Sequence, residues 1–232
     1  MTGENPHNGT ALVRSLVRLG FPPDSRTMSA STLAATRLPS VSDITQLQID
    51  TVAAWHRGPI ENPYDGFKQL VCKQHEYNYR LWHQEDIARS PTADDVKIAA
   101  VKRAIDTLNQ QRNDMIEKLD DAITELLGTL HVRPADGAPI NTETAGSAID
   151  RLSIMSLRLY HYREQLDRDD ADASHRAMVA ARIDLCQQQH TDLSNSLQAL
   201  LVDIFDGKKQ HKTYRQMKMY NDPSLNPEIY QS

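Results

Sequence analysis

The stretch DVKIAAVKRAIDTLNQQRNDMIEKLDDAITELL, residues 95–127, decides the fold class. Its apolar residues recur every three or four positions, which is the spacing of one face of an α-helix. Ser90-Pro91 separates this segment from the one before it, and Gly128 follows it. Both are signals that end helices. The pattern therefore predicts a helix of about 36 residues, roughly 54 Å long. The apolar positions are Ile98, Val101, Ile105, Leu108, Met115, Leu119, Ile123 and Leu126.

Other segments repeat this helical spacing on both sides of the long helix. They predict helices over residues 42–57, 62–89, 147–166 and 174–205, with a loop over residues 129–146 that is rich in turn residues. The predicted fold class is all-α: a single bundle of about four long helices plus a short N-terminal helix. Residues 1–40 are predicted to be a flexible N-terminal segment, in which Met28 is an alternative start. The domain is predicted to span residues 41–232, with the basic tail 208–232 packed on the bundle.

Composition excludes several classes of protein. Only 9 of the 232 residues are Gly, fewer than the many tight turns of a β-rich fold need. The net charge of −5 argues against general nucleic-acid binding, which depends on neutralising phosphates. No apolar run reaches the ~20 residues that span a bilayer, so no membrane span is expected. Two Cys, at positions 72 and 186, cannot form a disulfide framework, and a cytoplasmic location is predicted.

Polar side chains occupy the face of the 62–89 helix that should point into the bundle. Starting from Val71, steps of three and four residues reach His75, Asn78, Trp82, Glu85 and Arg89. Each unpaired polar group buried there would cost several kcal/mol. These side chains therefore need either polar partners or a bound ligand.

The long helix offers such partners, because Arg112 interrupts its apolar stripe between Leu108 and Met115. A buried guanidinium must meet a carboxylate or an anion. Polar residues at helical spacing flank this gap, and Asp150 follows the start of the next helix. We therefore predict a functional pocket, with a purely structural polar network as the alternative. The flanking residues are Asp106, Asn109, Asn113 and Glu117.

Each candidate residue has an expected role in this pocket. The candidate catalytic residues are His75, Glu85, Asp86 and Asp106. Mg²⁺ or Mn²⁺ is the candidate cofactor, because these ions prefer oxygen ligands, with Glu85, Asp86 and Asp114 as the candidate metal ligands. The candidate ligand-binding residues are Asn78, Trp82, Arg89, Asn109, Arg112, Asn113, Glu143, Asp150, Arg215, Lys218 and Tyr220.

Several long blocks resemble a bacterial all-helical family of unknown function. They include Asn141-Thr142-Glu143-Thr144-x-Gly146-Ser147-x-Ile149-Asp150-Arg151-Leu152-Ser153 and Tyr214-Arg215-Gln216-x-Lys218-Met219-Tyr220-Asn221-Asp222-Pro223. The resemblance covers about residues 42–230. It implies a context of cell-surface glycan biosynthesis, since members are often encoded near glycosyltransferases. It also draws attention to residues 141–147, where a helix N-terminus would suit a phosphate, and to the tail, which is expected to fold over the pocket.

The function hypothesis is an enzyme that acts with a divalent metal on a phosphorylated or nucleotide-linked (sugar) small molecule. Glu85 and Asp86 would bind the metal or act as general base, and His75 would transfer protons. Arg89 and Arg112 would clamp the anion. Two alternatives are a non-catalytic accessory or scaffold protein and a small-ligand sensor. A homodimer is the expected assembly.

Overall fold

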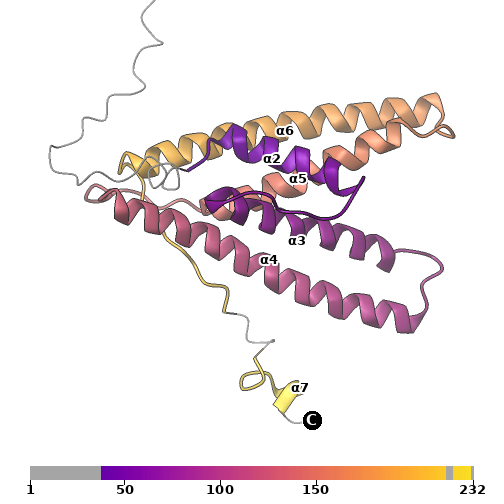
Figure 1. The fold of residues 1–232 in the computed structure, drawn as a ribbon, viewed down its shortest axis with the longest axis horizontal. Coiled ribbons are helices and arrows are strands. Elements are labelled where there is room, and N and C mark those ends of the chain that lie inside the picture. The colour runs from indigo at the N-terminus through magenta and orange to yellow at the C-terminus, as the bar shows by residue number, and fades with distance from the viewer. Residues whose placement is uncertain (1–37, 218–221, 231–232) are drawn as a thin grey trace, which may run out of the picture. The chain divides into compact units, whose positions relative to one another are not determined.

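The helices begin and end where local capping chemistry places them. The computed structural model describes residues 38–217 and 222–230, and Figure 1 shows their arrangement. The helices are α2 (Val41–Trp55), α3 (Gly66–Ala88), α4 (Asp95–Thr129), α5 (Ala145–Leu166), α6 (Ala173–Phe205) and the short α7 (Pro227–Tyr230). The described residues contain no strand, only an isolated bridge between Ile140 and Gln210. The all-α prediction is confirmed.

Several helices begin at other residues than predicted, as their capping residues show. Ser40, rather than Ser42, caps α2, and it forms a reciprocal capping box with Asp43. The Asn62-Pro63 pair does not begin α3, since the Asn62 side chain donates to the Gln69 carbonyl at 3.0 Å and the helix begins at Gly66. Thr144 caps α5, which places its first turn two residues earlier than predicted. The flexible segment was predicted over residues 1–40, of which residues 1–37, including Met28, lie outside the described part. Of the remainder, Leu38 packs against the core and Ser40 caps α2.

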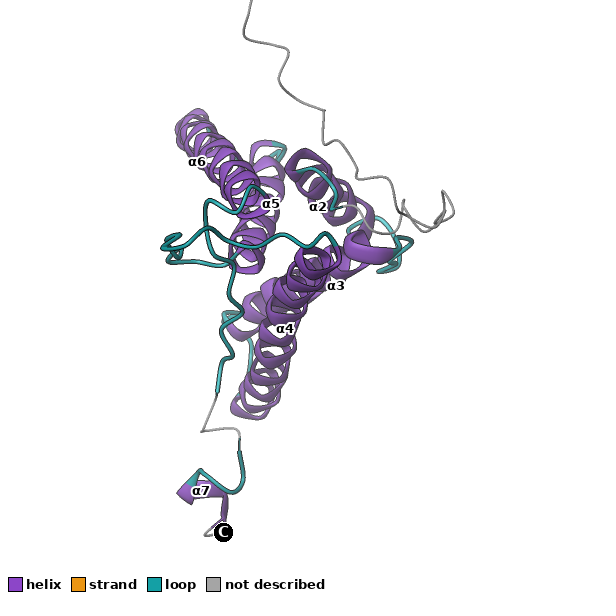
Figure 2. Cartoon of the chain, turned by 90° about the vertical axis from the view of Figure 1, so that its left-hand side faces the viewer, coloured by secondary structure: helices purple, strands orange, loops and turns teal. Residues whose placement is uncertain are grey.

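Two helical hairpins and one added helix make up the bundle. α3 packs along α4, α5 packs along α6, and α2 packs on α5 and α3 (Figures 1 and 2). All described residues belong to one compact unit. Its core lies where the helices meet, and seven Leu and Ile side chains there are almost fully buried: Ile44, Leu119, Ile123, Ile149, Leu152, Leu157 and Leu197.

α5 begins very close to α4 because Gly146 has no side chain. A Cβ added there would lie 2.6 Å from the Ile116 carbonyl oxygen and 2.9 Å from Oδ1 of Asp120. The Gly146 N–H donates to that same carboxylate at 2.8 Å. The glycine therefore lets the helix N-terminus rest directly on a buried Asp side chain.

The first part of the C-terminal segment runs along α4. His211 Nε2 lies 2.9 Å from the Asp120 carbonyl oxygen, and Arg215 forms ion pairs with Glu117 and Asp121 at 3.0 and 2.9 Å. These contacts lie at the end of the bundle where α5 begins. Lys218 and Tyr220 fall outside the described residues, so their predicted binding role is not placed. None of the described helices is long and apolar enough to cross a membrane.

Candidate metal centre

Part of the predicted inward polar stripe meets partners on α5, where Asp150 is a common acceptor. Glu85 and Arg89, which were predicted to face inward as well, instead pair with each other, with side chains 43% and 70% exposed. Arg112 donates to both carboxylate oxygens of Asp150, at 2.8 and 2.6 Å. Gln74 and Asn78 donate to Oδ1 of the same residue at 2.6 and 2.9 Å. The Asp150 side chain is only 4% exposed. We call Gln74, Asn78, Arg112, Asp150 and Ser153 the Asp150 network.

His75 belongs to the same region and is completely enclosed. Its Nδ1 lies 2.7 Å from Ser153 Oγ, and its ring stacks on Trp55 with centroids 5.2 Å apart. Burial lowers the pKa of His75 to about 3, and the Gln48 backbone opposes that shift in part. The imidazole is therefore neutral at pH 7, and this position suits a structural role better than the predicted proton transfer.

Among the described residues, the predicted metal ligands Glu85, Asp86 and Asp114 and the predicted catalytic Asp106 belong to no group of three or more ligand atoms within 4.8 Å of one another. Glu85 pairs with Arg89 at 2.7 Å, Asp106 pairs with Lys102, and Asp114 accepts from Gln110 at 2.7 Å. Each of these pairs spans four residues within one helix. Helix geometry places such side chains side by side on one surface, so the sequence spacing alone accounts for them.

The remaining predicted ligand residues are spread over several surfaces. Glu143 pairs with Arg151 at 2.7 Å, and Arg215 lies on α4 as described above. Asn109 and Asn113 are half-buried on α4. Trp82 stacks against His161 with centroids 4.6 Å apart. Trp82 therefore contacts His161, which belongs to a group of histidines that the sequence did not predict as a site.

The N-terminus of α5, expected to bind a phosphate, is already occupied by the chain itself. Oδ1 of Asp120 accepts from Gly146, and the Thr144 hydroxyl accepts from the Ser147 N–H at 3.1 Å. Burial raises the pKa of Asp120, while hydrogen bonds from Thr144 and Gly146 oppose that shift. An internal carboxylate therefore takes the place of an external anion.

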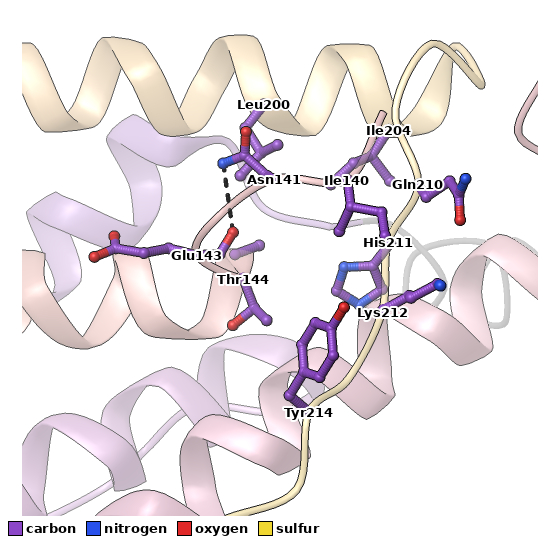
Figure 3. Close-up of a pocket in the computed structure, with 11 residues that line it drawn as sticks. Ile140, Asn141, Glu143, Thr144, Leu200, Ile204, Gln210, His211, Lys212 and Tyr214 are labelled. Atoms are coloured by element: carbon purple, nitrogen blue, oxygen red, sulfur yellow. Dashed lines mark hydrogen bonds between the residues drawn. The ribbon is translucent and has the colours of Figure 1, made fainter. Parts of the chain in front are cut away.

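A small cavity adjoins this helix end (Figure 3). Asn141, Glu143, Lys212 and Tyr214 are among the residues that line it. Its volume is about 10 Å³, which leaves room for roughly one water molecule. A nucleotide or a sugar phosphate does not fit into it.

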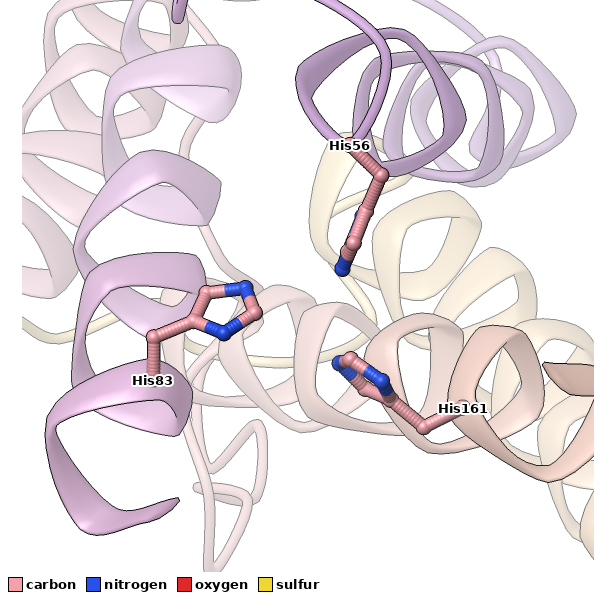
Figure 4. Close-up of side chains that lie close together, drawn as sticks. All are labelled: His56, His83 and His161. Carbon is pink, nitrogen blue, oxygen red and sulfur yellow. The ribbon is translucent and has the colours of Figure 1, made fainter. Parts of the chain in front are cut away.

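Three histidines from three separate elements converge elsewhere in the bundle (Figure 4). His56 caps the end of α2, His83 lies on α3, and His161 lies on α5. One ring nitrogen of each lies within 4.8 Å of those of the other two. We call these three residues the histidine cluster.

Hydrogen bonds fix the orientation of two of these rings. His56 Nδ1 lies 2.8 Å from the Val52 carbonyl, which can only accept, so Nδ1 carries the proton. His161 Nδ1 lies 2.7 Å from Glu164 Oε2. Metal-binding histidines usually donate the far ring N–H to a carbonyl or a carboxylate in this way. The Nε2 atoms of all three rings are buried and have no hydrogen-bond partner in the structure.

Aromatic rings surround the histidine cluster. Tyr160 stacks on His56 with centroids 4.1 Å apart, and Tyr79 contacts His56 and His83 edge to face. Burial is the main cause that lowers the pKa of His83 and of His161. Both rings therefore stay neutral at pH 7, which is the form that binds metals.

Comparison with known proteins gives a family but no activity. The family model described as "Protein of unknown function (DUF4254)" matches residues 68–213, more than half of the chain. The chain belongs to this family. No curated protein and no solved structure matches it. The DUF4254 region contains His83, His161 and the Asp150 network, and His56 precedes it.

The sequence of this DUF4254 protein contained a weak signal for the histidine cluster. His83 and Asp86 on α3, and His161 and Glu164 on α5, are each three residues apart, so each pair shares a helix face. His56 has no such neighbour. Its place in the cluster depends on how α2 packs on the other helices, and no local sequence pattern predicts that packing.

Proposed function

We propose that this protein binds a divalent transition-metal ion, with Zn²⁺ the first candidate, through His56, His83 and His161. The observation that carries the proposal is the set of three buried Nε2 atoms without partners, on rings whose nitrogens lie within 4.8 Å of one another. Buried polar atoms are nearly always satisfied, so three orphans in one place call for a ligand.

Imidazole is a preferred ligand of Zn²⁺ and of other late transition metals, whereas Mg²⁺ and Mn²⁺ prefer oxygen. Three imidazole ligands therefore favour Zn²⁺ over the Mg²⁺ or Mn²⁺ expected from the sequence. Tetrahedral coordination with Zn–N distances of about 2.1 Å places ligand nitrogens about 3.4 Å apart. The three rings must close on the ion by up to about an ångström and a half, which is a movement of side chains rather than of helices.

The enzyme hypothesis with a phosphorylated or nucleotide-linked substrate has less support from the geometry. Arg112 is held by Asp150 and Arg89 by Glu85, so neither predicted anion clamp is free. The accessory-protein and sensor hypotheses are both compatible with a bound metal. We therefore limit the proposal to the ion and its ligands.

The test measures zinc binding to the full chain after chelator treatment, by calorimetry and by metal content after dialysis. One tightly bound Zn²⁺ per chain is expected, together with a higher melting temperature, because an ion at 100 times its Kd adds about 2.7 kcal/mol to stability. His83→Phe and His161→Phe keep an aromatic ring and remove the ligand, so each should abolish this binding.

His190→Phe is the matched control. His190 on α6 is also half-buried with an orphan Nε2, but it lies outside the histidine cluster. This variant should bind zinc as the unmodified chain does. Equal zinc binding by the unmodified chain, His83→Phe and His161→Phe would overturn the proposal, as would no binding at all.

A further inference from the structure

One carboxylate beside the histidine cluster has no structural partner. Asp86 is exposed on α3, three residues after His83, and therefore on the same helix face. Among the described residues, no side chain forms a hydrogen bond or an ion pair with it. Its neighbour Glu85 is paired with Arg89 at 2.7 Å, so a local partner does exist for the adjacent acidic residue.

The charge of Asp86 acts on two rings of the cluster. Burial lowers the pKa of both His83 and His161, and Asp86 opposes that shift in each case. Charge interactions weaken with distance and are screened at a surface. These directions agree with the position of Asp86 on the same face of α3 as His83.

Glu164 stands in the corresponding position on α5, three residues after His161, but it has a different task. Its Oε2 is 2.7 Å from His161 Nδ1, on the side of the ring that faces away from the orphan Nε2. This is the outer position from which a carboxylate orients a metal-binding histidine. The pairs His83/Asp86 and His161/Glu164 thus have the same spacing but different contacts. Of the two carboxylates, only that of Asp86 has no hydrogen-bond or ion-pair partner among the described residues.

We propose that Asp86 supplies the fourth ligand of the metal centre, an inference that rests on the metal binding proposed above. Helical bundles bind metals with a Glu-x-x-His pair on one helix, and His83 and Asp86 have the same spacing in the reverse order. The Asp86 carboxylate is not part of the group whose ligand atoms lie within 4.8 Å of one another. Its exposed side chain must therefore turn toward the rings when the ion binds.

The proposal specifies the ligand set as three neutral imidazole nitrogens and one carboxylate oxygen. Four ligands satisfy the tetrahedral preference of Zn²⁺. The carboxylate also removes one unit of the ion's charge and favours a hard or borderline divalent ion over soft Cu⁺, which selects thiolate and thioether ligands. The ion would join α2, α3 and α5 through side chains of all three helices.

The experiment compares Asp86→Ala with Glu85→Gln in the full chain, both at exposed or half-buried positions of α3. Zinc affinity is measured by competition with a chelator, and Co²⁺ replaces Zn²⁺ to report coordination by visible absorption. Asp86→Ala should weaken zinc binding at least about 10-fold, the lower end of what even an outer-sphere change costs. It should also change the Co²⁺ spectrum, whereas Glu85→Gln should do neither.

Two further variants separate a ligand from a nearby charge. Asp86→Glu should restore part of the affinity and the four-coordinate Co²⁺ spectrum. Glu164→Gln should weaken affinity but keep that spectrum, because Glu164 acts through His161. If Asp86→Ala keeps the affinity and spectrum of the unmodified chain while His83→Phe loses binding, Asp86 is not a ligand and the three-histidine proposal stands. If His83→Phe also binds normally, the proposed function itself fails.

Discussion

The Asp150 network and the histidine cluster are both built from polar side chains of α3 and α5, yet they differ in how their atoms are satisfied. Asp150 accepts four hydrogen bonds, two of them from one guanidinium. In the histidine cluster, three buried Nε2 atoms have no partner. The first region also has single buried atoms without a partner, Oε1 of Gln74 and Nε2 of His75, but its central carboxylate is satisfied by its neighbours. Three unpartnered atoms on rings whose nitrogens lie within 4.8 Å of one another indicate an external ligand instead.

The largest expected effect comes from breaking the Asp150 network. Arg112→Met leaves the Asp150 carboxylate buried without its charged partner, and the loss of one member of a buried pair costs about 3–5 kcal/mol. Arg112 itself is 27% exposed, which places the expectation at the lower end of that range. Chemical denaturation measures the change in the free energy of unfolding.

Arg151→Met is the control, since Arg151 and Glu143 form a pair that is about half exposed. Pairs of that kind contribute at most about 1 kcal/mol. Equal or increased stability of Arg112→Met would contradict a structural role for the network.

A smaller effect is expected from acidification, through His75. Because its pKa is about 3 in the folded chain and 6.5 ordinarily, the unfolded state binds an extra proton between these values. The stability that depends on neutral His75 is therefore fully present above pH 6.5. As the pH falls below that value, the free energy of unfolding decreases by up to about 1.4 kcal/mol per pH unit. His75→Gln should reduce this slope by about one proton, measured by denaturation at pH 7.5 and pH 5. An unchanged slope would place His75 outside the enclosed region.

The smallest effect on stability and zinc affinity is expected from substitution of Asp106, which is a candidate catalytic residue in the sequence. Its carboxylate pairs with Lys102 on the exposed surface of α4. Asp106→Asn should change stability by less than about 0.5 kcal/mol and leave zinc affinity unaltered. A loss of zinc binding in this variant would show that the histidine cluster is not the metal centre.

Much of the fold is predictable because helix periodicity and capping are local. The apolar stripe of residues 95–127 corresponds to α4 (Asp95–Thr129), and the turn residues after Gly128 correspond to the loop before α5. The errors concern the residues at which helices begin. Asn62-Pro63 is a strong local signal for a helix start, but the Asn62 side chain donates to the Gln69 carbonyl instead of capping the helix. Such contacts depend on the path of the chain around the helix end.

The site was predictable only in part, for a related reason. The predicted stripe placed His75 and Asn78 on the inward face of α3, where both are buried, but it also included Glu85 and Arg89, which pair with each other near the surface. The pattern did not show that Asn78 and Arg112 both donate to Asp150. The histidine cluster depends on His56, which reaches α3 and α5 only through the packing of α2, so no spacing along the chain reveals it.

The most direct test of the central claim is anomalous scattering at the zinc absorption edge from crystals of the full chain grown with Zn²⁺. We expect one strong peak among His56, His83 and His161, with Nε2 of His56 and His161 about 2.1 Å from it. A zinc ion bound elsewhere, with the three rings unchanged and their Nε2 atoms still unpartnered, would contradict it.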